Sequence, residues 1–286
     1  MYLKKWIWLI SLVSIKNVAI TGNLEKINEQ KIVDYIANSF LKNKFNIVTV
    51  KPIKFKDAPS LDIQEINQAN TDILCVLGGD GTIIWTIRNL LKQTPILGVN
   101  VGSKGVLADI FPDEIDLAIE AIKKNMLVIQ ERMMLKVTIR KQLVESKILN
   151  EAFFYRSSLT KLPTYLIVQE PFLIKKRMDG LIVSTPTGST GHSFSLNGPI
   201  VDETLHIFLL NPIGSVQRLP PIIVPPSPMK ISCSDEAILV LDGQIKYDLK
   251  KDEEVLIEES EERAKLVKVL SGRLSQIEKL GFDIIG

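Results

Sequence analysis

The sequence predicts an α/β plus β fold, in which an N-terminal α/β domain is followed by a C-terminal β-sandwich domain. Up to about residue 126, short apolar runs alternate with helical patterns, which is typical of βαβ units around a parallel sheet. From residue 127 onward, short β-prone runs follow one another, and Pro, Gly and Ser separate many of them, as in two packed sheets. The pattern changes once, near residue 127, and this change predicts the domain boundary.

The alternation in residues 1–126 predicts a Rossmann-like domain. Its expected strands lie at 18–21, 45–50, 73–77 and 96–101, and its expected helices lie at 27–43, near 83–91 and at 115–122. In the second of these helices, Ile83, Ile87 and Leu90 recur at helical spacing, which predicts one face packed on the sheet.

Residues 127–265 are expected to form the β-sandwich. Their β-prone runs lie at 135–139, 166–169, 181–183, 207–210, 222–224, 238–241 and 254–257. The tail at 266–286 returns to a helical pattern over 273–280, and we expect this helix to pack back on the first domain.

The N-terminus has a mixed character. Lys4 and Lys5 precede an apolar run at 6–15 that has the charge and length of a signal-peptide core. The run has about half of the ~20 residues that a membrane-spanning helix needs, and no small-x-small cleavage site follows it. Residues 1–16 are therefore expected to be an extra strand or the product of a start codon placed too early, and the protein is expected to be cytoplasmic.

Composition narrows the classes of partner. The sequence has 35 Lys and Arg against 33 Asp and Glu, and a net charge of +2 is too small to require nucleic acid or an anionic membrane. Cys75 and Cys233 form no CxxC pair, which argues against a disulfide framework or a zinc site. Without a dense Asp/Glu/His cluster in the sequence, no residue is expected to ligate a metal, and any magnesium would arrive with a phosphate ligand.

A glycine-rich turn carries the sharpest signal. Residues 78–82 read Gly-Gly-Asp-Gly-Thr and lie between an apolar run and a helical pattern. Glycines at a strand-to-helix turn let backbone amides approach a phosphate, and the helix N-terminus adds partial positive charge. A carboxylate there is unfavourable unless it holds magnesium or accepts a proton from a reacting hydroxyl. Asp80 thus points to phosphoryl transfer; the alternative is a helix cap in a tight turn.

A second glycine-rich turn, at 102–105, follows another expected strand and so would lie on the same edge of the sheet, where open α/β sheets bind ligands. Its Lys104 is either a phosphate contact or a solvated loop lysine.

The expected second domain holds the longest polar signature. Arg177 and Asp179 precede the run at 181–183, and nine of the ten residues at 184–193 are Ser, Thr, Gly or Pro, the exception being His192. Such short donors suit the hydroxyls and phosphates of a nucleotide. His192 is expected to be a ring-edge contact or a surface residue. Two shorter motifs, at 150–151 and 242–244, are by themselves routine turn signals.

Taken together and in this order, these segments resemble the NAD kinase family. The resemblance covers residues from about 17 to 280 and rests on 78–82, 100–109, 150–151, 179–193, 198–200 and 242–244. The turn at 78–82 is shared with diacylglycerol kinases, sphingosine kinases and phosphofructokinases, whereas the run at 179–190 is far more specific.

The resemblance implies a nucleotide held between the two domains and across a subunit contact, in a homodimer or homotetramer. It implies that Asp80 accepts the proton of the 2′-hydroxyl of the adenosine ribose of NAD, with Gly81 against the same nucleotide. The further nucleotide-binding residues that it implies are Asn150, Glu151, Arg177, Asp179, Thr190, Gly191, His192, Ser193, Phe194, Ser195 and Gln244.

This chain departs from the family pattern at several positions. Gly191 and His192 stand where Ala and Tyr are frequent, and Val106 replaces a common Phe. Where many members have a Pro-His pair after a strand, this chain has the segment from Asn211 to Arg218, so no family contact is carried over there, including one at Gly214.

The activity implied is transfer of the γ-phosphoryl group of magnesium-ATP to NAD, giving NADP. Other triphosphates and inorganic polyphosphate are alternative donors. Two other functions are a lipid or sugar kinase that shares the turn at 78–82, and a non-catalytic sensor of NAD or NADP. The hydroxyl-rich run disfavours the first, and Asp80 disfavours the second, because binding alone gains nothing from a carboxylate beside phosphates.

Overall fold

The computed structural model describes residues 15–23, 30–102, 105–269 and 276–280. The chain divides into two compact units, a first domain of residues 1–131 with 264–274 and a second domain of residues 132–263 with 275–286. Most of the predicted N-terminal extension, and Lys104, lie outside the described residues.

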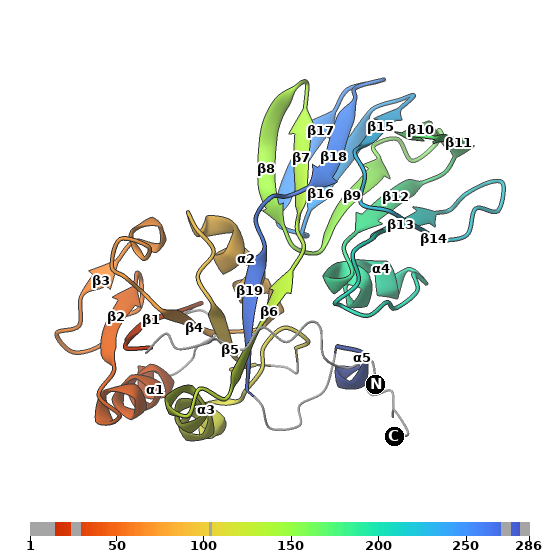
Figure 1. The fold of residues 1–286 in the computed structure, drawn as a ribbon. Helices are drawn as coiled ribbons and strands as arrows, with labels where there is room; N and C mark the ends of the chain where they lie inside the picture. The colour runs from red at the N-terminus through yellow and green to blue at the C-terminus, as the bar shows by residue number, and fades with distance from the viewer. Residues whose placement is uncertain (1–14, 24–29, 103–104, 270–275, 281–286) are drawn as a thin grey trace. The chain divides into compact units, whose positions relative to one another are not determined.

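The first domain is built on one seven-stranded sheet (Figure 1). The pairings β1–β2, β2–β3, β1–β4, β4–β5 and β5–β19 are all parallel, as the βαβ pattern predicts. In spatial order the strands are β3 (Ser60–Leu61), β2 (Asn46–Val50), β1 (Asn17–Gly22), β4 (Ile73–Leu77), β5 (Ile96–Val99), β19 (Ala264–Val269) and β6 (Leu127–Arg132).

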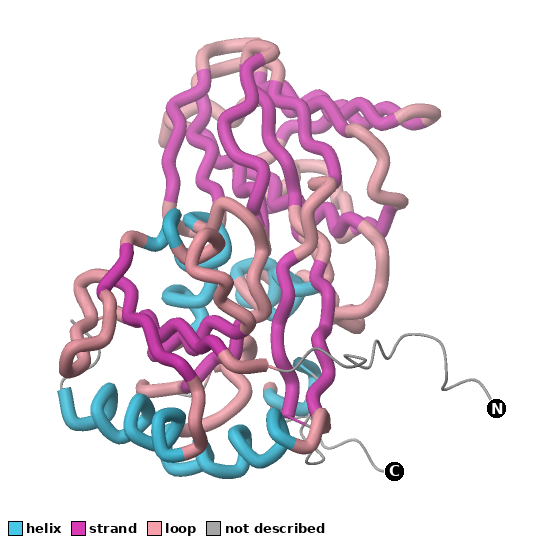
Figure 2. Tube along the Cα trace, turned by 60° about the vertical axis from the view of Figure 1, so that its left-hand side comes forward, coloured by secondary structure: helices cyan, strands magenta, loops and turns pink. Residues whose placement is uncertain are grey.

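Helices cover both faces of this sheet. The helices are α1 (Gln30–Lys42), α2 (Asp80–Asn89) and α3 (Ile115–Lys123), with 3-10 turns at Ile63–Glu65 and Pro112–Glu114. Helices α1 and α3 lie side by side (Figures 1 and 2) and share one hydrophobic cluster with Cys75 and Leu97. Helix α2 packs on the opposite face, where Ile83 lies against Gly98 so closely that a Cβ there would meet its Cδ1 at 2.7 Å.

The strand order has a switch point between β1 and β4. From β1 the chain moves outward to β2 and β3, and it then returns to form β4 and β5 on the other side of β1. Crossovers leaving in opposite directions open a crevice at the carboxyl ends of the two central strands, where open α/β sheets bind ligands. The turn at 78–82 follows β4 at this point.

The second domain is a sandwich of two six-stranded sheets, and the neighbouring strands within each sheet are antiparallel. One sheet has the order β11 (Phe172–Arg177), β10 (Thr164–Gln169), β15 (Met229–Cys233), β18 (Val255–Glu259), β7 (Leu135–Ile139) and β8 (Gln142–Ile148). The other has the order β14 (Ile222–Val224), β13 (Phe208–Ile213), β12 (Gly180–Ser184), β9 (Glu151–Arg156), β16 (Ala237–Leu241) and β17 (Ile245–Leu249).

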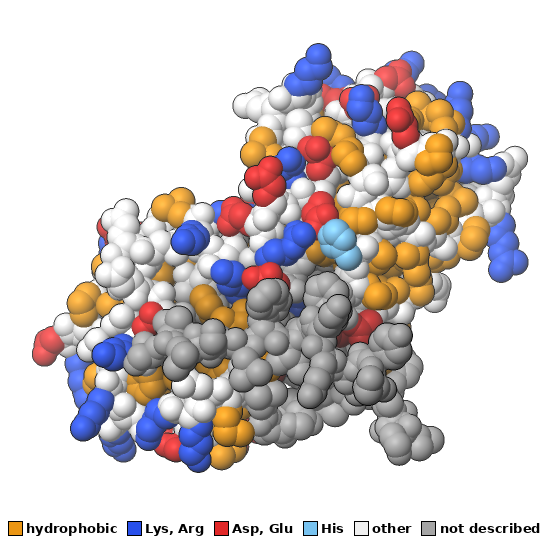
Figure 3. Space-filling view, in the orientation of Figure 1, with side chains coloured by type: hydrophobic (Ala, Val, Ile, Leu, Met, Phe, Trp, Pro, Cys, Tyr) orange, Lys and Arg blue, Asp and Glu red, His pale blue; other side chains and the backbone are white. Residues whose placement is uncertain are grey.

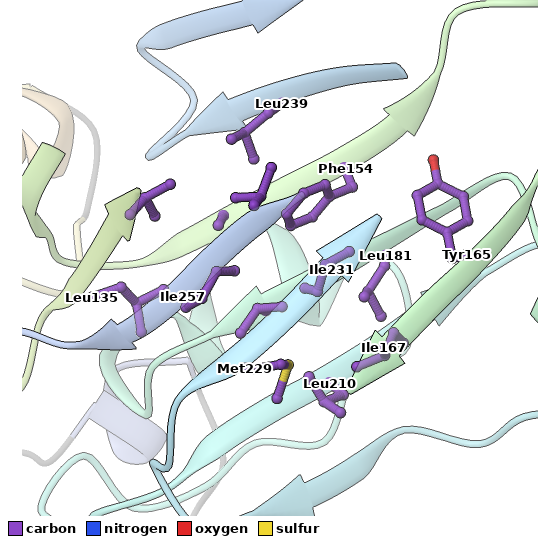
Figure 4. Packing of buried hydrophobic residues seen from close by; sticks show 14 of the residues in the cluster. Leu135, Phe154, Tyr165, Ile167, Leu181, Leu210, Met229, Ile231, Leu239 and Ile257 are labelled. Carbon is purple, nitrogen blue, oxygen red and sulfur yellow. The ribbon is translucent and has the colours of Figure 1, made fainter. Parts of the chain in front are cut away.

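The core of the second domain lies between its sheets. Phe154 and Leu181 from one sheet face Ile167, Ile231 and Ile257 from the other (Figure 4), and all five are buried. Alternate residues along these strands point inward, so apolar residues at every second position bury one face of each sheet. This confirms the predicted β-rich C-terminal domain.

The C-terminal part differs from the predicted helical return. The element that rejoins the first domain is strand β19, whose sequence Ala-Lys-Leu-Val-Lys-Val is rich in branched apolar residues and pairs in parallel with β5. The short helix α5 (Gln276–Lys279) instead hydrogen-bonds within the second domain, where Arg132 Nη1 donates to Gln276 Oε1 at 3.2 Å. The predicted packing of this helix on the first domain is therefore not confirmed.

Candidate active site

Asp80 is the first residue of α2, directly after the switch-point turn. Its carboxylate accepts a hydrogen bond on each oxygen, from the backbone N–H of Val106 at 2.9 Å and from that of Leu107 at 3.0 Å. The two donors belong to the loop after β5, so they fix the carboxylate against a second loop of the same sheet edge. A carboxylate has about four lone-pair directions, so two remain for a ligand.

The loop that holds Asp80 is itself tied down. Asp109 is buried, accepts a hydrogen bond from the N–H of Val269 at 2.9 Å and forms an ion pair with Lys268 at 3.1 Å. Gly105 lies so close to Asp80 that a Cβ would meet Oδ1 at 2.4 Å. A glycine at this position is therefore required by the close approach of the carboxylate.

In the second domain, Leu149 and Asn150 form the turn between β8 and β9, Glu151 begins β9, and Asp242 holds all three. The Asp242 carboxylate accepts hydrogen bonds from the backbone N–H of Leu149 at 2.9 Å, of Asn150 at 2.7 Å and of Glu151 at 3.2 Å. Asp242 sits in the hairpin turn between β16 and β17 at a φ of 50°, a conformation that Asp tolerates better than most residues. The motif at 242–244 is thus more than a routine turn.

The hydroxyl-rich run packs against Asn150. It forms a 3-10 turn (Thr187–Thr190) and the short helix α4 (His192–Ser195). The Asn150 carbonyl accepts hydrogen bonds from the Thr185 N–H at 2.9 Å and the Ser184 hydroxyl at 3.1 Å. At Gly188, a Cβ would meet the same carbonyl oxygen at 2.2 Å. The two motifs, far apart in sequence, therefore form one cluster.

Several hydroxyls of this run stabilise the turn itself. Thr185 Oγ1 donates to the Leu149 carbonyl at 2.5 Å, Thr190 Oγ1 to the Thr187 carbonyl at 3.2 Å, and Ser195 Oγ to the His192 carbonyl at 2.8 Å. The Ser and Thr content of the run therefore has a structural cause as well as the predicted ligand-binding one.

The residues at 191–194 continue the hydroxyl-rich run beside this cluster. A Cβ on Gly191 would lie 3.5 Å from Asn150 Nδ2 and 3.6 Å from Glu151 Oε2. His192 packs edge-on against Phe153, with ring centroids 4.8 Å apart, as the expected ring-edge contact would. Phe194 is 40% exposed, and Ser193 is buried.

Asn211 is a supporting residue that the sequence did not single out for a role. Its Nδ2 donates to the Ser193 carbonyl at 3.1 Å and to the Leu196 carbonyl at 3.2 Å, which holds α4 on strand β13. The sequence signal for this role is an asparagine that directly follows the apolar run Phe208–Leu210, where a strand is expected to be buried.

Arg177 and Asp179 do not join this cluster. They precede β12, whereas the hydroxyl-rich run follows it, and a five-residue strand separates its ends by about 16 Å. Asp179 Oδ1 forms an ion pair with Arg156 Nε at 2.5 Å, and Gly214, at a φ of 60°, leaves room for the carboxylate because a Cβ would meet Oδ2 at 2.0 Å. Arg177 is exposed on strand β11.

Glu151 has an unusual environment. Its side chain is buried, and its Oε2 has no hydrogen-bond partner. Burial, followed by the charge of Asp242, raises the pKa of the Glu151 carboxyl to about 8. The cluster therefore contains two adjacent carboxyl groups, of which Asp242 is stabilised by three amides and Glu151 is not.

The raised pKa predicts how stability depends on pH. Because the folded protein holds the Glu151 proton up to about pH 8 while the unfolded chain releases it near pH 4.3, the stabilisation is complete below about pH 4 and is lost as pH rises to about 8. The slope is at most about 1.4 kcal/mol per pH unit. We expect Glu151→Gln to remove this loss in urea unfolding measured from about pH 5 to 8. Parallel pH dependence of wild type and variant would contradict it.

Neither a metal-binding cluster nor a membrane-spanning helix is found among the described residues. Within them, no group of three His, Cys, Asp or Glu side chains could hold a metal ion. In the same ranges, no helix has the length and apolar character needed to cross a membrane.

A carboxylate fixed at the switch point of a parallel sheet, and a hydroxyl-rich cluster in a following β-sandwich, are the features expected of a phosphotransferase that acts on nucleotides. The comparisons agree with this class. The family model for the ATP-NAD kinase N-terminal domain matches residues 12–126, and that for the C-terminal domain matches residues 149–269. The chain belongs to the NAD kinase family.

Individual relatives give the same answer. An NAD kinase of Clostridium botulinum (strain Eklund 17B / Type B) is 32% identical over 262 residues, which cover 88% of this chain and 90% of the relative. An NAD kinase of Thermococcus sibiricus is 34% identical over 223 residues, 76% of this chain and 80% of the relative.

Solved structures of two kinases have the same fold. The structure of an NAD kinase from Archaeoglobus fulgidus in complex with ATP has a TM-score of 0.70 and 25% identity, covering 93% of this chain and 97% of that one. Yeast NADH kinase complexed with NADH has a TM-score of 0.80 at 22% identity, covering 95% and 89%, and this likeness shows the fold alone.

Proposed function

We propose that this chain transfers the γ-phosphoryl group of ATP to the 2′-hydroxyl of the adenosine ribose of NAD, giving NADP. The observation that carries the proposal is the Asp80 carboxylate, which two backbone amides hold at the switch point of the sheet. The membership of the NAD kinase family supports the same reaction.

In the proposed step, Asp80 orients the ribose hydroxyl and accepts its proton as the oxygen attacks the γ-phosphorus and ADP leaves in line. Its two remaining lone-pair directions suit this role, because the amides of Val106 and Leu107 use only one direction on each oxygen. The N-terminus of α2, with Gly81 in its first turn, adds positive potential beside the phosphates. Magnesium arrives as part of the triphosphate substrate.

The second domain supplies recognition in this proposal. Asn150 and Glu151 bind the adenosine part or its ribose, and the turn from Thr190 to Ser195 surrounds the remaining nucleotide. Gln244, exposed at the tip of the hairpin after Asp242, closes the site. Arg177 and Asp179 lie at the other end of β12, so we propose that they serve the site of a second copy of the chain.

A homodimer or homotetramer is the proposed assembly, in the cytoplasm. Hydrophobic side chains gather on one face of the second domain (Figure 3). Large apolar side chains that this domain exposes include Leu205, Val216 and Ile223, with exposed fractions of 48%, 63% and 50%. Exposed apolar surface of this kind favours contact with another protein chain.

The test of the function is direct. Purified protein is mixed with NAD, ATP and magnesium, and NADP is detected with an NADP-specific dehydrogenase. Formation of NADP supports the proposal, and ATP is then replaced by other triphosphates and by polyphosphate. Binding of NAD without any NADP from any donor would support the non-catalytic sensor instead.

The contact between Gly105 and Asp80 predicts that a side chain at Gly105 lowers kcat. A Cβ at Gly105 would meet Asp80 Oδ1 at 2.4 Å, so in Gly105→Ala the carboxylate or the loop must move. Since a displacement of about 1 Å at a reacting group can cost about 10²-fold in rate, we expect a loss of kcat on that scale. Gly102→Ala is the control, because a Cβ there meets nothing within 4 Å. Equal activity of the two variants would contradict the assigned geometry.

A further inference from the structure

Two neighbouring carboxyl groups in the second domain have unequal partners. Asp242 accepts three backbone N–H hydrogen bonds, which stabilise its charged form. Glu151 lies beside it, 4% exposed, and its Oε2 has no partner. Two adjacent carboxylates cannot both ionise without repulsion, and the one with hydrogen-bond donors keeps the charge. Glu151 is therefore the group of the pair that keeps its proton.

No cation near Glu151 offsets this repulsion among the described residues. Asp242 faces it from the β16–β17 turn, and Ser184, opposite Glu151 on β12, carries no charge. Titratable groups on the neighbouring elements have partners of their own: His192 packs on Phe153, Lys246 pairs with Asp248 at 3.0 Å, and Lys147 pairs with Glu262 at 3.7 Å. On β8 and β17, Glu145 accepts hydrogen bonds from the N–H groups of Ser146 and Lys147, and the Tyr247 hydroxyl donates to the Val144 carbonyl.

The unpartnered Oε2 of Glu151 is buried and lies beside Gly191. A Cβ on Gly191 would be 3.6 Å from Glu151 Oε2 and 3.5 Å from Asn150 Nδ2, so residue 191 brings only backbone up to these two polar atoms. An ionised carboxyl accepts hydrogen bonds only, whereas a protonated one has an O–H to donate. The charge state of Glu151 thus decides which ligand atoms can meet it.

We propose that Glu151 meets the nucleotide as a neutral carboxylic acid and donates a hydrogen bond to an uncharged acceptor, a ring nitrogen or a sugar oxygen. This inference rests on the proposed function and deepens it, since it assigns a proton to a residue of the nucleotide site. A neutral Glu151 also leaves one negative charge fewer beside a ligand that carries phosphates.

The experiment measures NAD binding by calorimetry, without ATP or magnesium, from about pH 6.5 to 9.5. Glu151→Gln replaces the neutral acid by a group that also donates, and Glu151→Ala removes the donor. We expect Kd of the wild type to be constant up to about pH 7 and to rise about tenfold per pH unit above the Glu151 pKa of about 8. In Glu151→Gln, Kd should stay within about threefold of the wild-type low-pH value and should not change with pH.

Other results would distinguish failure of the inference about Glu151 from failure of the proposed function. If Glu151→Gln binds as weakly as Glu151→Ala at pH 6.5, a neutral donor at this position does not support binding, and if wild-type affinity rises with pH, the charged form binds. Either result overturns the inference while the proposed function stands. If the wild type neither binds NAD nor makes NADP, both are overturned. Far-UV circular dichroism and unfolding of the three proteins establish that each is folded at every pH used.

Discussion

Asp80→Asn is expected to lower kcat by about 10² to 10⁴-fold, the range typical of lost general-base assistance. The variant cannot accept the proton of the ribose hydroxyl. It also disturbs the anchor, because an amide side chain offers one oxygen to two N–H donors, so either Val106 or Leu107 loses its acceptor. NAD binding, measured by calorimetry, should persist, since the residues proposed for recognition lie in the second domain.

Asp116→Asn is a matched control for this experiment. Asp116 is also an aspartate in the first turn of a helix of the first domain, but it is exposed on α3. Its kcat is expected to stay within about twofold of wild type, as for surface substitutions in general. Wild-type turnover by Asp80→Asn would remove the assigned role.

Asp242→Ala is expected to have the largest effect on stability. The substitution leaves three backbone N–H groups, of Leu149, Asn150 and Glu151, without their acceptor. Each unsatisfied buried donor costs about 1–3 kcal/mol, and alanine at a positive φ adds strain, so the free energy of unfolding should fall by about 3 kcal/mol or more. Urea unfolding measures this loss, and loss of NAD binding should accompany it.

Two further variants test whether the stability loss comes from the missing hydrogen-bond acceptor. Asp242→Asn keeps one oxygen acceptor and tolerates the positive φ, so its free energy of unfolding should fall by only about 1–2 kcal/mol. Because it also removes the charge beside Glu151, it should lower the pKa of Glu151. Asp248→Ala, in the same hairpin, removes an aspartate whose side chain is 80% exposed, and its effect should be within about 0.5 kcal/mol. If Asp242→Ala were as stable as Asp248→Ala, Asp242 would not be the anchor of the turn.

The sequence predicted the two-domain architecture because the evidence for it is local. Hydrophobic periodicity marks β4 at Ile73–Leu77 and β7 at Leu135–Ile139 with the bounds that the structure has. The strand-forming composition of β19 is local too, but its pairing with β5 depends on contacts between segments far apart in the chain, so the sequence does not indicate that this strand rejoins the first domain. Of the helical pattern expected over 273–280, the structure describes residues 276–280, and helix α5 occupies Gln276–Lys279.

In the candidate site, too, the local features could be predicted from the sequence and the contacts between distant segments could not. The turn at 78–82 could be predicted, since a glycine-rich strand-to-helix junction has a local signature. The partners of Asp80 could not, because Val106 and Leu107 act through backbone N–H groups, which every residue but proline possesses. The same holds for Asp242, whose acceptor role follows from how the hairpin approaches the turn at Leu149–Glu151. The proposed ligand contacts of the individual side chains remain predictions.

The position of β19 between β5 and β6 also governs how the chain can mature on the ribosome. When residues 1–131 have emerged, β5 and β6 each have an unpaired edge, and their common partner is made only after the whole of 132–263. Unpaired strand edges are sites of wrong association, and a nascent chain carries them for as long as the intervening domain takes to be translated. The first domain is thus begun first but completed only after residues 132–263 have been made, so the translation time of that segment sets how long the edges of β5 and β6 stay unpaired.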